Sequence, residues 1–127
     1  MKTTPDNYTE VGRLTAPIAK EIHRKAAYIY INRNYLRHIE NDHPKELNAL
    51  GIDAITLVRL VVNQYNRIYK GSGDSLLLVV YNGRPKAAAI ELNWALKDEF
   101  YEVKTATIMK KDFLERKTLL WPLEDKK

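Results

Sequence analysis

The sequence predicts an α+β fold in which N-terminal helices pack on one face of an antiparallel sheet. The first 70 residues hold the segments whose apolar side chains recur three and four apart, which is the spacing of an amphipathic helix. Three strand-like runs follow within residues 76–109, and the turn signal Asn82-Gly83 separates the first two. Helices followed by strands are typical of an α+β fold, whereas alternation would indicate βαβ units.

Composition limits the chain to one soluble domain over residues 1–127. Its 127 residues suffice for a core, and 45% hydrophobic with 29% charged residues is typical of a folded protein. The chain has no cysteine, which excludes disulfides, a thiol nucleophile and a cysteine zinc site. No signal peptide is evident, and the longest apolar run, residues 76–81, is too short to cross a bilayer. We therefore expect a cytoplasmic protein with no membrane partner.

The chain is basic, with a formal net charge of +5 and a pI near 9.4. A positive field favours polyanionic partners, RNA among them. An ordinary solvated surface explains the same numbers equally well. Charge alone therefore does not separate a nucleic-acid-binding protein from any other basic domain.

The N-terminal third predicts a strand followed by a helix. Residues 1–7 are expected to be a loose tail. Residues 8–14 predict a short edge strand, which Gly12 weakens. Pro17 suits the first turn of a helix over residues 16–26.

A second strand and a histidine-bearing helix follow. Residues 27–31 are rich in strand formers, which favours a strand over the alternative of a continued helix. Asn34 is a suitable N-cap for a short helix that ends near His43, because the residue before Pro44 is pushed out of the helical region. Residues 45–52 are expected to be a connection.

The longest predicted helix runs from residue 54 to about residue 70 and is capped by Asp53. The Gly-Ser-Gly-Asp cluster at residues 71–74 stops it. Its face is defined by apolar residues that recur at three and four: Leu57, Val58, Val61, Val62, Tyr65, Ile68 and Tyr69.

The predicted sheet is a meander. A type I′ turn at Asn82-Gly83 joins strands over residues 76–81 and 86–94. Residues 100–109 form a third strand, with even positions on one face and odd positions on the other. Residues 111–127 are a charged extension, whose apolar patch at 119–123 either docks as a last strand or covers an edge.

The first candidate catalytic residues are two histidines, His38 and His43. His38 and Asp42 are four apart, so in a helix the carboxylate can hold the imidazole's tautomer. His43 joins the same site only if the helix unwinds before Pro44. The alternatives are a surface pair for His38 and a favourable helix-dipole contact for His43.

The late strand supplies Lys104, Thr105 and Thr107. A lysine and threonines there are equally typical of an ordinary solvated strand. The sequence has no dinucleotide fingerprint, P-loop, H-E-x-x-H or G-x-S-x-G motif. We therefore predict neither a metal nor a cofactor.

Four short strings carry a family resemblance. They are Tyr-Ile-Tyr-Ile-Asn at 28–32, Leu-Arg-His-Ile at 36–39, His-Pro at 43–44 and Tyr-Glu-Val-Lys-Thr-Ala at 101–106. Together they resemble the phage-associated barnase–EndoU–colicin E5/D–RelE-like nuclease domains over roughly residues 8–110. Members of that family occur in phages, prophages and toxin systems.

The resemblance implies a metal-independent ribonuclease with N-terminal helices on an antiparallel sheet of about four strands. It matches His38 and His43 to the family's two histidines and Thr105 to its late-strand threonine. Three residues compete for the family's basic position: Arg37, Lys86 and Lys104. It further implies an RNA substrate, and a cognate inhibitor or host protein is a possible partner.

Our working hypothesis assigns His38 as base or acid and His43 as its counterpart or a substrate contact. Lys104 and Thr105 would stabilise the scissile phosphate. Further substrate contacts are expected from Arg37, Lys86 and Thr107. The rival hypotheses are a non-catalytic module that binds nucleic acid or protein, and a structural domain of a larger assembly.

Overall fold

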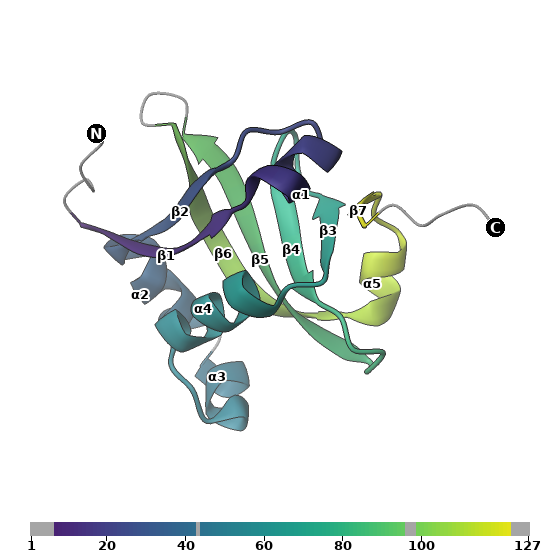
Figure 1. The fold of residues 1–127 in the computed structure, drawn as a ribbon. Coiled ribbons are helices and arrows are strands. Elements are labelled where there is room, and N and C mark those ends of the chain that lie inside the picture. Colours follow the sequence, from purple (N-terminus) through teal and green to yellow (C-terminus); the bar gives the residue numbers. More distant parts are fainter. Residues whose placement is uncertain (1–6, 43, 96–98, 123–127) are drawn as a thin grey trace.

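The computed structural model describes residues 7–42, 44–95 and 99–122. That part of the chain forms one mixed sheet with five helices (Figure 1). The elements in chain order are β1 (Tyr8–Leu14), α1 (Ala16–Glu21), β2 (Ala27–Asn32), α2 (Arg33–Asp42), α3 (Pro44–Leu50), α4 (Ala54–Gln64), β3 (Arg67–Lys70), β4 (Leu76–Val80), β5 (Lys86–Ala95), β6 (Phe100–Lys110), α5 (Lys111–Glu115) and β7 (Leu119–Trp121).

The α+β class is confirmed, but the prediction of about four antiparallel strands is wrong. The sheet has seven strands in the order β1-β2-β6-β5-β4-β3-β7, and the β2–β6 pair is parallel. The predicted meander is present as the antiparallel run β6-β5-β4. The additional strands include β3, which the sequence pattern assigned to a helix, and β7, where the apolar patch docks as a last strand.

Two apolar clusters hold the fold together. The larger cluster combines side chains of α1, α2, α3 and α4 with alternate strand positions such as Ile29 and Ile90. The smaller cluster lies on the other strand positions, such as Val79 and Ala89, and includes Leu114 of α5. Since successive strand side chains point to opposite faces, the two clusters cover opposite faces of the sheet.

The helix predicted over residues 54–70 is shorter than its apolar periodicity suggested. Asp53 is its cap as predicted, with Oδ1 accepting from Thr56 N at 3.0 Å. The helix ends at Gln64, and Tyr65 takes extended backbone angles. Residues 67–70 then pair with β4, because Ile68 and its aromatic neighbour also suit a buried strand.

Two helix predictions in the N-terminal half also need correction. The helix over residues 16–26 ends at Glu21, because His23 takes a left-handed φ of 59°. Residues 45–52, expected to be a connection, instead contribute most of α3. The segment at 27–31 is a strand, as favoured.

The Asn82-Gly83 signal marks a hairpin but not a type I′ turn. Five residues separate β4 from β5. Gly83 has a φ of 80°, whereas Asn82 is not among the described residues with positive φ, which a type I′ turn requires at both centres. Instead, Asn82 Oδ1 accepts from Arg84 N at 3.1 Å, an Asx turn that stabilises the longer loop.

Strand β6 carries a bulge that breaks the predicted even–odd alternation. Glu91 pairs with Thr105 and Leu92 pairs with Val103, which leaves Lys104 as the extra residue. Val103 and Ala106 therefore both face the larger cluster, although one position is odd and the other even. A bulge of this kind redirects the side chain at the extra residue.

The close approach of β1 to α4 yields a stability prediction. A Cβ on Gly12 would overlap Cγ1 of Val62, so Gly12→Ala is expected to lower the free energy of unfolding by about 1–3 kcal/mol. Urea unfolding of Gly12→Ala, Val62→Ala and the double variant measures the coupling. Since Val62→Ala removes the obstructing methyl group, the double variant should be less destabilised than the sum of the single variants. Purely additive costs would contradict the proposed overlap.

Candidate functional site

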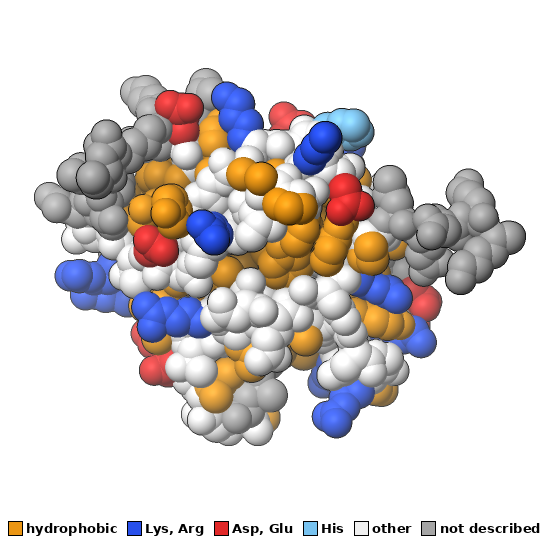
Figure 2. Space-filling view, viewed as in Figure 1, with side chains coloured by type: hydrophobic (Ala, Val, Ile, Leu, Met, Phe, Trp, Pro, Cys, Tyr) orange, Lys and Arg blue, Asp and Glu red, His pale blue; other side chains and the backbone are white. Residues whose placement is uncertain are grey.

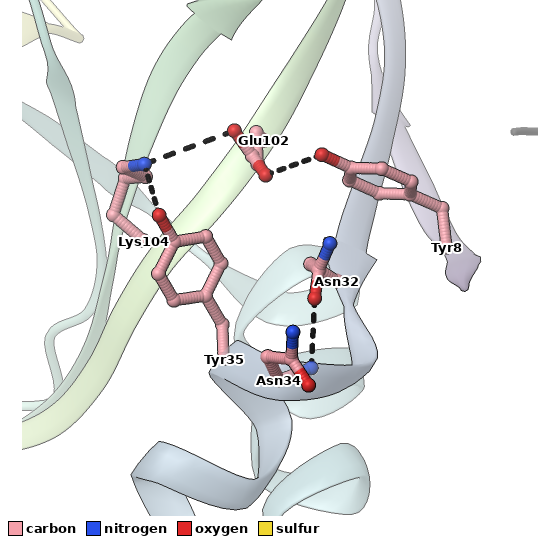
Figure 3. Close-up of polar contacts among 6 residues, drawn as sticks. All are labelled: Tyr8, Asn32, Asn34, Tyr35, Glu102 and Lys104. Carbon is pink, nitrogen blue, oxygen red and sulfur yellow. Dashed lines mark hydrogen bonds and ion pairs between the residues drawn. The ribbon is translucent and has the colours of Figure 1, made fainter. Parts of the chain in front are cut away.

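The candidate site starts where β2 passes directly into α2. Asn32 Oδ1 accepts a hydrogen bond from Asn34 N at 2.7 Å (Figure 3). The capping side chain is therefore Asn32, not the predicted Asn34. This direct connection fixes the first turn of α2 beside the end of β2.

One stripe of α2 carries three titratable side chains. Tyr35, His38 and Asp42 are spaced three and four apart, so their side chains lie along one face, while Ile39 is buried in the larger cluster. His38 Nε2 lies 2.8 Å from Asp42 Oδ2, as the i,i+4 spacing predicts. The two side chains are 62% and 49% exposed, so they are open to a ligand from solvent.

A polar network at the start of this stripe joins three elements of the fold (Figure 3). We call it the Lys104 network, and it consists of Tyr8, Tyr35, Glu102 and Lys104. Lys104 Nζ donates to Tyr35 Oη at 2.6 Å and lies 3.8 Å from Glu102 Oε1. Tyr8 Oη donates to Glu102 Oε2 at 2.7 Å. Strand β1, strand β6 and helix α2 are thereby tied together through side chains.

Electrostatics within the network keep its cation charged. The hydrogen bond to Tyr35 raises the pKa of Lys104 above its ordinary value of 10.5, and the nearby Glu102 carboxylate acts in the same direction. The hydrogen bond to Glu102 likewise raises the pKa of Tyr8. At neutral pH the network therefore presents an ammonium group held between a phenol and a carboxylate.

Backbone register explains why Lys104 reaches α2. Parallel pairing of β2 with β6 stops at Val103, so the next residue of β6 has no partner from β2. Lys104 is also the extra residue of the bulge. Its ammonium group lies 4.4 Å from the centre of the Tyr35 ring, at the hydroxyl end of the ring, where it donates to Oη.

This arrangement can perform acid–base and anion-binding chemistry. If Asp42 accepts the proton on Nε2 of a neutral His38, Nδ1 keeps the lone pair that a general base needs. Tyr35 Oη accepts from Lys104 and can still donate its own proton to a ligand oxygen. Sequence reasoning missed Tyr35, although its position three residues before His38 was a usable signal.

The two threonines predicted from the late strand lie on one face of β6. Thr107 pairs with Ala89 of the smaller cluster, and Thr105, two residues away, shares its face. Glu102 of the Lys104 network lies on this face too, because its partner Asn93 is two residues along β5 from Glu91, the partner of Thr105. The register therefore places both threonines on the face of β6 that carries Glu102, and their predicted roles stay predictions.

The remaining candidates lie elsewhere or outside the described residues. Arg37 is exposed on α2, next to His38 in sequence. Lys86 pairs with Lys110 at the far end of β6, six residues and therefore about 20 Å from Lys104. His43 lies outside the described residues, so its predicted role stays a prediction.

Disrupting the Tyr35 contact yields a prediction about pKa and alkaline stability. Tyr35→Phe removes the hydrogen bond, so the pKa of Lys104 should fall towards 10.5 in a lysine side-chain NMR titration. A raised folded-state pKa stabilises the fold below the unfolded value and loses that contribution as pH rises through the folded value. The stability difference between wild type and Tyr35→Phe should therefore shrink above about pH 10.5.

Tyr28→Phe is the matched control, since Tyr28 is an exposed phenol on the neighbouring strand. An unchanged Lys104 titration in Tyr35→Phe would contradict the assignment of the shift to this hydrogen bond.

We searched the structure for a metal-binding group and a membrane-spanning helix, and compared the chain with known proteins. Within residues 7–42, 44–95 and 99–122, no three His, Asp or Glu side chains gather as a metal-binding group. No helix in the same ranges is long and apolar enough to cross a membrane. No protein-family model, curated protein or solved structure matches the chain. Function must therefore be argued from the site itself.

Proposed function

We propose that this protein is a metal-independent endoribonuclease that cleaves RNA through the 2′-hydroxyl. One observation carries the proposal. The imidazole of His38, paired with Asp42, lies on the same stripe of α2 as Tyr35, whose hydroxyl contacts the Lys104 ammonium group. A base and a hydroxyl donor thus lie on two adjoining turns of α2, and a cation from β6 meets the hydroxyl.

The proposed reaction is an internal transesterification. His38 Nδ1 removes the 2′-hydroxyl proton, the 2′-oxygen attacks phosphorus and the bond to the 5′-oxygen breaks. Lys104 and Tyr35 stabilise the charge that develops on the phosphoryl oxygens. The products are a 2′,3′-cyclic phosphate and a 5′-hydroxyl. The leaving 5′-oxygen takes its proton either from His43, as the sequence hypothesis holds, or from the Tyr35 hydroxyl, which the structure adds.

The biological setting in this proposal comes from the resemblance described above. A phage-associated or toxin-type ribonuclease would act on cytoplasmic RNA. It would also need a cognate inhibitor or another means of protecting its host. These expectations rest on short strings around His38 and Lys104 and are independent of the geometry.

A non-catalytic module that binds nucleic acid or protein is the second candidate. The observation that favours it is that Lys104 is already held by Tyr35 and lies near Glu102, so part of its charge is compensated within the fold. The high exposure of His38 and Asp42 points the same way. A catalytic test of His38 separates the two candidates.

The first functional prediction concerns His38. His38→Ala should lower the rate of RNA cleavage about 10²–10⁴-fold in EDTA, because a general base is lost while the exposed position leaves the fold intact. Gel or mass-spectrometric analysis of wild-type products should show a 2′,3′-cyclic phosphate, and DNA should not be cut. His23→Asn is the matched control, since it removes an exposed imidazole elsewhere and asparagine tolerates the left-handed φ.

The outcomes of this experiment point in different directions. Lost cleavage with intact RNA binding in His38→Ala supports the enzyme. A weak cleavage signal that is the same in wild type and His38→Ala identifies a contaminating nuclease. In that case the binding module replaces the ribonuclease as the proposed function.

A second functional prediction identifies the general acid. The pH dependence of cleavage should be bell-shaped if one group acts as base and another as acid. Whichever of Tyr35→Phe and His43→Ala removes the acid should lose the alkaline limb of the profile, while the other variant keeps it. A profile with both limbs in both variants would place the acid on a different residue.

A further inference from the structure

Like charges are paired directly across the far end of the sheet. Lys86, the first residue of β5, pairs with Lys110, the last residue of β6. Lys111 N then donates to Pro85 O at 2.8 Å, which extends the contact between the two chain segments by one residue. Directly opposed cations reduce the stability of a sheet, so this arrangement does not serve folding.

The described part of the chain does not compensate these charges by ion pairs. Among its residues no carboxylate lies within salt-bridge distance of Lys86, Lys110 or Lys111. Asp112 borders the same site but is outnumbered by the cations. Including Arg84 on the connecting loop, the local formal charge is +3, from four cations and one carboxylate. We call Arg84, Lys86, Lys110 and Lys111 the basic end. It belongs to the end of the sheet at which β6 runs into α5, which can be followed in Figure 1.

The three lysines of the basic end border a hollow in which an anion fits. The hollow has a volume of about 370 Å³ and is lined by Gly83, Pro85, Lys86, Lys110, Lys111 and Asp112. It adjoins a larger, mainly apolar hollow of about 760 Å³, because Pro85 and Lys86 line both. A chain bound at the lysines therefore has room to continue beyond them, which favours a polymer over a small free anion.

The position of the basic end relative to the candidate active site indicates how it is used. Six residues of β6 separate Lys110 from Lys104, a distance of about 20 Å. One phosphate cannot contact both places. On the face shown in Figure 2, other Lys and Arg side chains are scattered both within the face and at its edge.

We infer that the basic end is a phosphate-binding subsite that holds the backbone of single-stranded RNA at a distance from the scissile phosphate. Its role as a substrate subsite rests on the proposed ribonuclease function. Phosphate contacts of this kind position a strand without reading its sequence. The subsite would therefore make the enzyme prefer long single strands over short oligonucleotides of any sequence.

Salt-dependent binding tests the inference without requiring catalysis. The ligand is a single-stranded 2′-O-methyl RNA oligonucleotide, which lacks the attacking hydroxyl and cannot be cleaved by the proposed route. Lys86→Gln/Lys110→Gln is compared with Lys20→Gln/Lys70→Gln, a control pair of exposed lysines on α1 and β3. Two lost phosphate contacts should reduce the slope of log affinity against log salt by about 1.4, or about 25-fold in affinity near 0.1 M salt. The control pair should change the slope little.

Each outcome decides the inference. A reduced slope confined to Lys86→Gln/Lys110→Gln supports it, and a higher urea midpoint for that variant would show that the paired lysines cost stability. Equal losses in both variants, or unchanged binding, would overturn it. Loss of binding to phosphatidylserine vesicles with unchanged RNA binding would overturn it in favour of a membrane surface. Failure of the ribonuclease proposal appears separately, as absent cleavage of ordinary RNA by the wild type.

Discussion

The short parallel pairing of β2 with β6 is the constraint on which the rest of this structure depends. It joins the N-terminal hairpin to the C-terminal meander through three residue pairs, from Ile29–Tyr101 to Ile31–Val103. The side chains of the first and last of these pairs are buried in the larger core cluster, so the pairing is held by packing as well as by hydrogen bonds. Because the pairing stops at Val103, the chain leaves β2 as a helix beside the part of β6 that pairs with β5 but not with β2.

The candidate site forms where the pairing of β2 with β6 ends. The first turn of α2 brings Tyr35 to the bulged Lys104, and the hydroxyl–ammonium contact ties helix to strand. Functional groups that stand on regular elements are held more precisely than groups on loops. Here the base and its carboxylate come from a helix, while the cation comes from a strand. Their relative placement is therefore fixed by the core rather than by a flexible connection.

Much of the fold follows from local signals. The Asp53 cap, the strand at 27–31 and the three strands of the meander were predicted, because capping, β-propensity and turn signals act over a few residues. The end of α4 was not predicted, since Ile68 and Tyr69 fit the apolar spacing of a continued helix as well as that of a strand. Their backbone groups find partners in β4, and this non-local pairing overrides the helical pattern.

For the site, the sequence by itself determined the His38–Asp42 contact, because residues four apart on a helix are neighbours whatever the rest of the chain does. Only the tertiary structure decided that Lys104 meets Tyr35, 69 positions away, and that Glu102 meets Tyr8, 94 positions away. Those contacts depend on strand order and on a one-residue bulge. Side-chain spacing carries no information about either, since both are set by how distant strands pair.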